Sequence, residues 1–357
     1  MNDRKRLRLS LAAAFLLSGC GTYERHGLEP ALAAQIEKAS VRRQFNLSPE
    51  KEDRILALDP AHVTEKDIQE TLAQAPAPRL INIHGGISPV QRSMISFAKF
   101  LIAMGYPEAS IRNPGDGTYT FSCYESSDQI AGFIAWYYER EGLRPVIVGH
   151  SQGGMQTIKV LDKLASHSFP RPSVWNPLTW KNEHRYEITD PLTGRPRPIV
   201  GLALPYATSV GAGGLTRFLP NQWDMCGRLR TIPDSVEEFT GFYKEKDLLG
   251  GDFLGYGPAN FFKPNGTAHV RNIELPADYE HGKIPDTEHL AKNQQVRDRI
   301  NSYTPENRQE LEMDPNIMNP ELLHILWAAD VWYSLKKHWV LELQRGIRAQ
   351  RASGHVD

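Results

Sequence analysis

The chain has 357 residues, of which 40% are hydrophobic and 23% are charged, with a formal net charge of -1 at pH 7. This is the balance of an ordinary globular protein with enough apolar material for one large core. The near-zero charge gives no reason to expect nucleic acid as a partner.

The N-terminus has the pattern of a bacterial secretory signal. Four basic residues among the first eight precede a short apolar stretch at 9–17, which is too short to span a membrane. The stretch ends in Leu17-Ser18-Gly19-Cys20, which resembles the lipobox of bacterial lipoproteins. We therefore expect residues 1–19 to be removed and Cys20 to be lipidated. This predicts a protein of the bacterial cell envelope, anchored to a membrane and facing the periplasm or the exterior.

Residues 20–77 are expected to form a tether followed by short helices. Ser48 precedes a proline in a position typical of a helix N-cap, and the residues from Thr64 to Asp67 resemble a capping box. The two prolines within 75–78 then end any helix.

From residue 78 the chain alternates between short apolar runs and helical patterns. We expect strands at 79–83 and 110–112 and helices at 89–104 and 127–142, followed by a strand and helix around residue 151. Such βαβα alternation predicts an α/β fold with a mostly parallel sheet and helices on both faces, over residues 78–302.

The second half of the domain is less regular. A segment rich in proline and polar residues, at about 168–198, is too long for an ordinary connection, so we expect an insertion before a strand at 199–204. Further strands are expected at 238–243 and 269–275, and a helix at 288–300. Residues 303–357 are expected to form a helical extension packed on the core, with a basic amphipathic helix at the membrane surface as the alternative.

The most informative motif is Gly149-His150-Ser151-Gln152-Gly153-Gly154. The apolar run at 145–148 enters it and a helix-compatible segment leaves it, which is the strand, sharp turn and helix that a G-x-S-x-G nucleophile requires. The flanking glycines are expected where a Cβ would clash with the neighbouring strand and helix. Ser151 is therefore the candidate nucleophile.

A serine nucleophile needs an acid and a base, and where the serine lies in this motif they follow it in the order Asp or Glu, then His. Asp247 lies just beyond the strand at 238–243, and we favour it over Asp252 because it follows the strand end more closely. His289 and His281 both follow the strand at 269–275. We favour His289, because it leads into the last predicted helix; His281 is the alternative.

The serine also needs donors for an oxyanion. The backbone amide of Gln152 follows the nucleophile directly, and the glycine-rich loop after the first strand offers Gly86, with Ile87 as the alternative.

Together, the strand with His-Gly-Gly, the strand with Gly-His-Ser-Gln-Gly-Gly, the late aspartate and the late histidine resemble the α/β-hydrolase superfamily on its lipase and esterase side. The resemblance covers roughly residues 78–302. It implies an α/β-hydrolase fold and hydrolysis of a carboxylic ester or thioester, from a small molecule or a lipid, through an acyl-enzyme on Ser151, without a cofactor. An acyltransferase and a catalytically silent lipoprotein that binds a lipid or a partner are the alternatives.

Other chemistry is less favoured. The cysteines Cys123 and Cys226 could form one disulfide in an oxidising compartment, and the sequence leaves this open. His281, Asp286 and His289 could bind a metal, but loop histidines beside a serine nucleophile have a simpler use, so no metal is expected. The sequence leaves the oligomeric state undetermined.

Overall fold

The computed structural model describes residues 28–41, 47–165, 171–218, 220–225, 227–252, 257–308, 311 and 322–353. Cys20 and Cys226 lie outside these residues, so the lipid anchor and the pairing of Cys226 with Cys123 stay predictions. None of the helices in the described part of the chain is long and apolar enough to cross a membrane.

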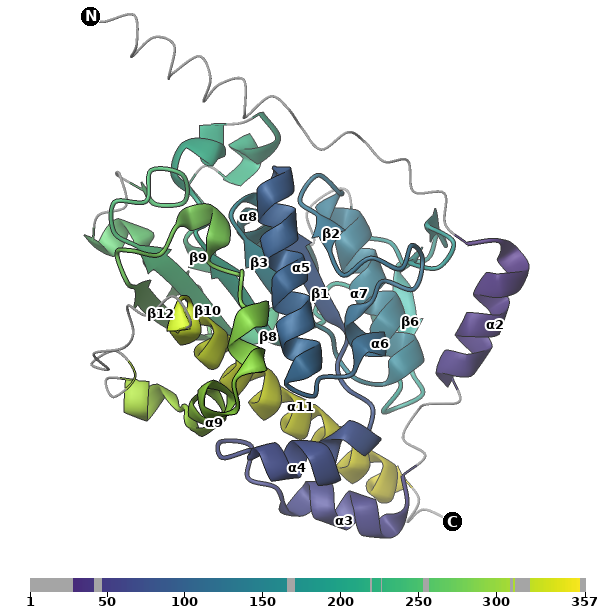
Figure 1. Ribbon diagram of the computed structural model, residues 1–357. Helices are drawn as coiled ribbons and strands as arrows, with labels where there is room; N and C mark the ends of the chain where they lie inside the picture. Colours follow the sequence, from purple (N-terminus) through teal and green to yellow (C-terminus); the bar gives the residue numbers. More distant parts are fainter. Residues whose placement is uncertain are drawn as a thin grey trace, which may run out of the picture.

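The centre of the molecule is a six-stranded sheet in which all strand pairs are parallel (Figure 1). The α/β fold with a parallel sheet is thus confirmed. The order across the sheet is β12-β10-β8-β3-β1-β2. Its strands are β1 (Leu80–His84), β2 (Phe121–Ser122), β3 (Val146–His150), β8 (Leu204–Val210), β10 (Val236–Lys244) and β12 (His269–Leu275).

The central strands are apolar on both faces because helices cover both. In β3, Val146 and Val148 pack into one hydrophobic cluster and Ile147 into the other, as the period of two along a strand requires. The first cluster includes residues of α5 (Ser88–Ala103), α9 (Gln294–Ser302) and α11 (Ile325–Ser353). The second includes residues of α7 (Ser127–Glu141) and α8 (Gln152–Ala165), on the opposite face of the sheet.

The segment before the sheet forms short helices at the lower end of the molecule in Figure 1. Ser48 is the N-cap of α3 (Pro49–Ala57), and Thr64 forms the predicted capping box at α4 (Glu65–Glu70), so both helix starts are confirmed. A 3₁₀ turn, η1 (Leu72–Gln74), leads to β1, and α2 (Pro30–Val41) lies against α7.

The long C-terminal helix α11 packs on the core, as expected. Trp327, Trp332 and Trp339 are fully buried in it. The side-chain amide of Gln344 donates to the main-chain oxygens of Ile55 and Leu58, which fixes α3 to α11. The alternative of a surface helix with a free apolar face is therefore wrong.

Three predicted elements differ from the structure. Residues 110–112 belong to α6 (Glu108–Ile111) and its C-cap, and the edge strand is β2 instead. The strand expected at 199–204 begins only at Leu204, because the chain turns at Gly201 with φ of +94°. The helix expected at 288–300 is divided at Asn293 into η7 (Glu288–Lys292) and α9, since Asn293 is extended and caps α9 with its side chain.

The insertion forms two small antiparallel ribbons, and the first lies against α7. Its strands are β4 (Trp175–Asn176), β5 (Lys181–Asn182), β6 (Glu187–Thr189) and β7 (Pro196–Pro198). A further two-stranded sheet pairs β9 (Thr231–Ile232) with β11 (Lys263–Pro264), and short 3₁₀ turns follow at η5 (Gly257–Asn260) and η8 (Pro305–Asn307).

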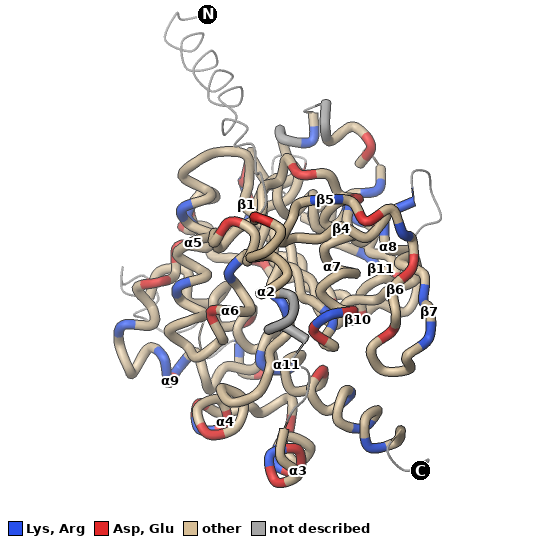
Figure 2. Tube along the Cα trace, turned by 90° about the vertical axis from the view of Figure 1, so that its right-hand side faces the viewer, with Lys and Arg blue, Asp and Glu red and all other residues tan. Residues whose placement is uncertain are grey.

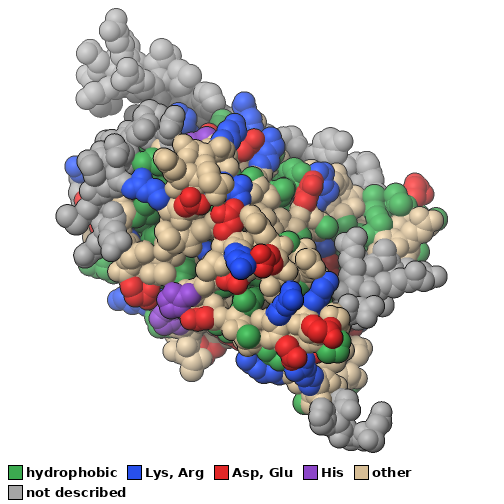
Figure 3. Space-filling view, turned by 60° about the horizontal axis from the view of Figure 1, so that its bottom comes forward, with side chains coloured by type: hydrophobic (Ala, Val, Ile, Leu, Met, Phe, Trp, Pro, Cys, Tyr) green, Lys and Arg blue, Asp and Glu red, His purple; other side chains and the backbone are tan. Residues whose placement is uncertain are grey.

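The surface charge matches the balanced composition. Basic and acidic residues alternate along the side of the molecule that carries α2 and α7 (Figure 2). The lower face, where α3 and α4 lie, also mixes both signs, with hydrophobic side chains scattered between them (Figure 3).

Candidate active site

The strand order creates a natural place for a site. From β1 the chain moves outward to β2, and it then returns to the other side of β1 to form β3 and the remaining strands. Loops that leave β1 and β3 therefore diverge at the carboxyl ends of these strands, which is where open α/β sheets bind their ligands. Gly85 and Gly86 follow β1, and Ser151 follows β3.

Ser151 sits in the tight turn between β3 and α8. Its φ is +57°, a left-handed conformation that is uncommon for a residue with a side chain and that is found at functional turns. A Cβ on Gly149 would lie 2.4 Å from the oxygen of Gly153, and one on Gly153 would lie 2.2 Å from the oxygen of Ile83. The expectation that both glycines let strand and helix approach closely is confirmed.

The histidine that meets the serine is His281, in the 3₁₀ turn η6 (His281–Lys283) after β12. Its Nε2 lies 2.9 Å from Oγ of Ser151, and its Nδ1 lies 2.7 Å from Oδ2 of Asp247. The structure thus brings His281, the alternative, to Ser151 and Asp247 in place of His289, the histidine favoured from the sequence. His289 lies in η7, beyond this contact, and its Nε2 has no hydrogen-bond partner among the described residues.

Asp247 is held as the sequence order predicts, three residues after the end of β10. Oδ1 accepts from the amides of Leu249 and Gly250, both at 3.0 Å, which leaves Oδ2 for His281. Burial alone would raise the pKa of Asp247. The hydrogen bond and charge of His281, together with the two amides, outweigh burial and hold this pKa below its ordinary value. The group is therefore a carboxylate at neutral pH.

Asp252, the alternative acid, has different partners. Its Oδ2 accepts from Arg217 at 2.6 Å and from Arg230 at 2.9 Å, and its Oδ1 accepts from the amide of Gly214. These contacts join η2 (Gly214–Phe218) to the loop after β10. Asp252 is thus a structural ion-pair partner, and the choice of Asp247 agrees with the geometry.

The glycine loop after β1 reaches the serine as expected. A Cβ on Gly85 would lie 2.9 Å from Cβ of Ser151, and one on Gly86 would lie 2.2 Å from Oε1 of Gln152. Gln152 begins α8, where the first amides have no partner within the helix. Among the described residues, neither the Gln152 nor the Gly86 amide donates a hydrogen bond. Ile87, the alternative donor, is the N-cap of α5, one residue further along.

The side chain of Gln152 also contacts Cys123. The Cys123 thiol lies 3.4 Å from Oε1 of Gln152, and both side chains are buried. Cys123 thus lies beside the first turn of α8, next to the glycine loop.

Gly211 is a site residue that sequence reasoning missed. It follows β8 with φ of +59°, and a Cβ there would lie 2.9 Å from Cε1 of His281 and 3.5 Å from Oδ2 of Asp247. The absence of a side chain at Gly211 lets the loop after β8 approach both His281 and Asp247 closely. The sequence contained a signal, since Gly211 opens a glycine-rich stretch at 211–214.

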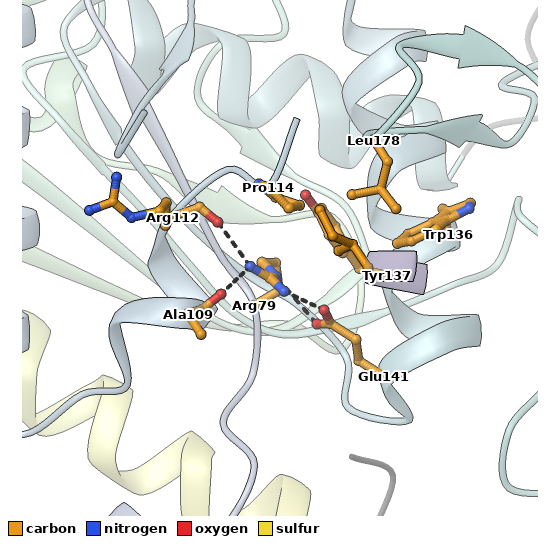
Figure 4. A pocket seen from close by; sticks show the side chains of 9 residues that line it. Arg79, Ala109, Arg112, Pro114, Trp136, Tyr137, Glu141 and Leu178 are labelled. Atoms are coloured by element: carbon orange, nitrogen blue, oxygen red, sulfur yellow. Dashed lines mark hydrogen bonds and ion pairs between the residues drawn. The ribbon is translucent and has the colours of Figure 1, made fainter. Parts of the chain in front are cut away.

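A cavity of about 180 Å³ lies at the other end of β1, away from Ser151. Figure 4 shows Arg79 in its wall, paired with Glu141 and donating to the main-chain oxygens of Ala109 and Arg112. The guanidinium also stacks on Tyr137, 4.6 Å from the ring centre. With these partners, Arg79 ties α6 and α7 to the start of β1, which indicates a structural junction.

Within the described ranges, no group of three His, Cys, Asp or Glu side chains is placed to hold a metal ion. This includes His281, Asp286 and His289, the set considered from the sequence.

Comparison of the chain with protein-family models, with curated proteins and with solved structures gave no significant match. The function is therefore inferred from the geometry of the site.

Proposed function

We propose that the protein is a serine hydrolase with an α/β-hydrolase fold, which cleaves carboxylic esters through an acyl-enzyme on Ser151. The observation that carries this proposal is the chain of contacts from Ser151 Oγ to His281 Nε2, at 2.9 Å, and from His281 Nδ1 to Asp247, at 2.7 Å. A nucleophile, a base and an orienting carboxylate in this order are the parts that acyl transfer requires.

Each residue has one role in the reaction. The Ser151 hydroxyl attacks the ester carbonyl while His281 Nε2 takes its proton, and the imidazolium then gives that proton to the leaving alcohol. Asp247 keeps the proton on His281 Nδ1 and stabilises the imidazolium. In the second half of the reaction, His281 takes a proton from a water molecule, which attacks the acyl carbonyl. The imidazolium then returns the proton to Ser151 Oγ as the carboxylic acid leaves. The amides of Gln152 and Gly86 stabilise the oxyanion, since Gln152 follows Ser151, the Gly85-Gly86 loop lies against both residues, and neither amide donates elsewhere among the described residues.

The surroundings of the site favour an ester with an apolar part. Loops after β8 and β10 expose four large hydrophobic side chains, Phe218, Trp223, Leu248 and Leu249. The two loops are in close contact at Gly214 and Leu249. A Cβ added to Gly214 would lie only 2.5 Å from the main-chain oxygen of Leu249. Trp223 lies in η3 (Pro220–Met225) and donates to the oxygen of Phe218. Exposed apolar side chains on the two loops that begin at Gly211 and Asp247 support the lipase and esterase side of the superfamily.

Turnover of p-nitrophenyl esters of increasing chain length tests the proposal. We expect hydrolysis by the wild-type protein, a preference for acyl chains longer than acetyl, and loss of turnover in Ser151→Ala. Equal rates for Ser151→Ala and wild type would refute it. Product analysis with water and an alcohol in competition shows whether the acyl group goes to water, as proposed, or to an alcohol.

A further inference from the structure

His150, the residue before the candidate nucleophile, is completely buried, and its side chain lies on a defined face of the sheet. It is the last residue of β3, where Val146 and Val148 pack into the same hydrophobic cluster as Ile284 and Leu290. Because side chains alternate along a strand, His150 points to this face too. The loop after β12 folds over the sheet on that face and brings His281 to the site.

The imidazole of His150 contacts the backbone of His281. Its Nε2 lies 2.7 Å from the main-chain oxygen of His281, and the two rings lie 5.2 Å apart between centres. A carbonyl only accepts, so Nε2 carries the hydrogen and donates it. Nδ1 has no partner among the described residues, and burial lowers the pKa of His150 to about 3. The ring is therefore neutral at working pH, with a single donor aimed at His281.

Two consecutive residues of the β3 turn thus contact the same histidine in two places. His150 holds the peptide of His281, and Ser151 lies 2.9 Å from its ring. Ser93 of α5 donates to the next carbonyl, that of Gly282, at 2.8 Å. At the far end of the loop, Ser96 accepts from the amides of Thr287 and Glu288. Of these contacts within the described part of the chain, only that of His150 reaches the main chain of His281.

We propose that His150 is a positioning residue for His281: its Nε2–H holds the His281 carbonyl so that the His281 ring reaches both Ser151 and Asp247. This inference rests on the proposed function, in which His281 is the base. His150 itself contacts no reacting atom. Its effect is on the distance across which the proton moves, and small displacements of a catalytic group lower turnover strongly.

Three variants of the full chain test the proposal. His150→Phe keeps a ring and removes the donor, whereas His150→Gln keeps an amide donor at a similar reach. Ser96→Ala is the matched control, because it removes two hydrogen bonds from the same loop away from His281. We expect His150→Phe to lower kcat about 10- to 100-fold with KM within about threefold. His150→Gln and Ser96→Ala should keep kcat within about fivefold of wild type.

A second readout does not depend on turnover. The proton shared by His281 Nδ1 and Asp247 gives a downfield proton NMR resonance when the pair is formed. We expect this resonance in the wild type, in His150→Gln and in Ser96→Ala, and its broadening or loss in His150→Phe. Should His150→Phe not fold, His150→Leu removes the same donor with a smaller side chain, and the same results are expected.

Full kcat and an intact resonance in His150→Phe would overturn the proposal. So would equally low kcat in the Phe and Gln variants with the resonance intact in both, because the donor would then not be the cause. If the wild type shows no Ser151-dependent hydrolysis, the proposed function fails, whereas the resonance still reports whether His150 positions His281.

Discussion

Nδ1 of His281 lies 2.7 Å from Oδ2 of Asp247, although the two residues are 34 positions apart in the chain. They meet because β10 and β12 are parallel neighbours, with Lys244 opposite Leu275 at their carboxyl ends. The loops that leave these ends therefore start side by side. The carboxylate and the imidazole are both largely buried, with 3% and 10% of their side chains exposed, so their interaction is shielded from water.

The choice between the two histidines gives the first prediction. Replacing His281 with Ala removes the group that contacts both Ser151 and Asp247, so kcat/KM for an ester should fall about 10⁴-fold or more. His289→Ala, at a histidine outside these contacts, should stay within about threefold of wild type. Steady-state kinetics on both variants checks this. A larger loss in His289→Ala than in His281→Ala would contradict the assignment.

Substitution of Asp247 should lower activity, whereas substitution of Asp252 should lower stability. Asp247→Asn removes the charge that fixes the His281 proton, and we expect about a 10⁴-fold lower kcat with little loss of stability. Asp252→Asn instead weakens the pairing with Arg217 and Arg230, which should cost about 2–3 kcal/mol of unfolding free energy and leave kcat nearly unchanged. Urea unfolding and kinetics on both variants measure this. The reverse pattern would make Asp252 the acid.

Gly211→Ala tests how closely the β8 loop approaches the base. The new Cβ would lie 2.9 Å from Cε1 of His281, so we expect a 10- to 100-fold lower kcat, on the order expected for a displaced catalytic group. Gly194→Ala is the control, because Gly194 has a similar φ of +65° and nothing within 4 Å of the added atom. Both variants should lose about 1–2 kcal/mol from backbone strain. Equal kcat in the two would argue against the contact.

The pH dependence of stability should report the buried state of His150. Burial first, and the charge of His281 next, lower the pKa of His150 from 6.5 to about 3, although Asp247 acts in the opposite direction. The unfolded chain therefore binds more protons between about pH 3 and 6.5, so this histidine makes the fold less stable as pH falls through that window.

His150→Phe lacks this titration. The unfolding free energy of the wild type minus that of the variant should fall by up to about 1.4 kcal/mol per pH unit below pH 6.5. Urea unfolding at pH 7, 5.5 and 4.5 provides the measurement. Curves that stay parallel over this range would show that folding does not lower the pKa of His150.

Much of the fold and part of the site follow from local sequence. The strand expected at 269–275 coincides with β12, and the glycines around Ser151 have the steric role that the motif indicates. These features depend on neighbours in the chain. Asp247 could be identified because it follows the end of a clearly apolar strand within three residues. The strand therefore fixes closely where this side chain lies.

The position of His281 depends on distant contacts instead. Both His281 and His289 follow β12, and their spacing does not decide which one returns to Ser151. The loop is placed by Ser93 and Ser96 of α5, which are 189 and 191 positions away from their partners in the chain. The strand expected at 110–112 fails for a related reason, because three residues carry too little periodicity to distinguish a strand from the helical turn that buries Ile111.

The central claim is that Ser151 is an activated nucleophile, and labelling with a fluorophosphonate probe tests it most directly. Mass spectrometry of the digested protein should locate one adduct on Ser151 in the folded wild type, with little labelling in His281→Ala and none on the corresponding peptide of Ser151→Ala. Unfolding in urea before labelling should abolish the adduct. A folded wild-type protein that leaves Ser151 unlabelled, or that labels equally well without His281, would contradict the account.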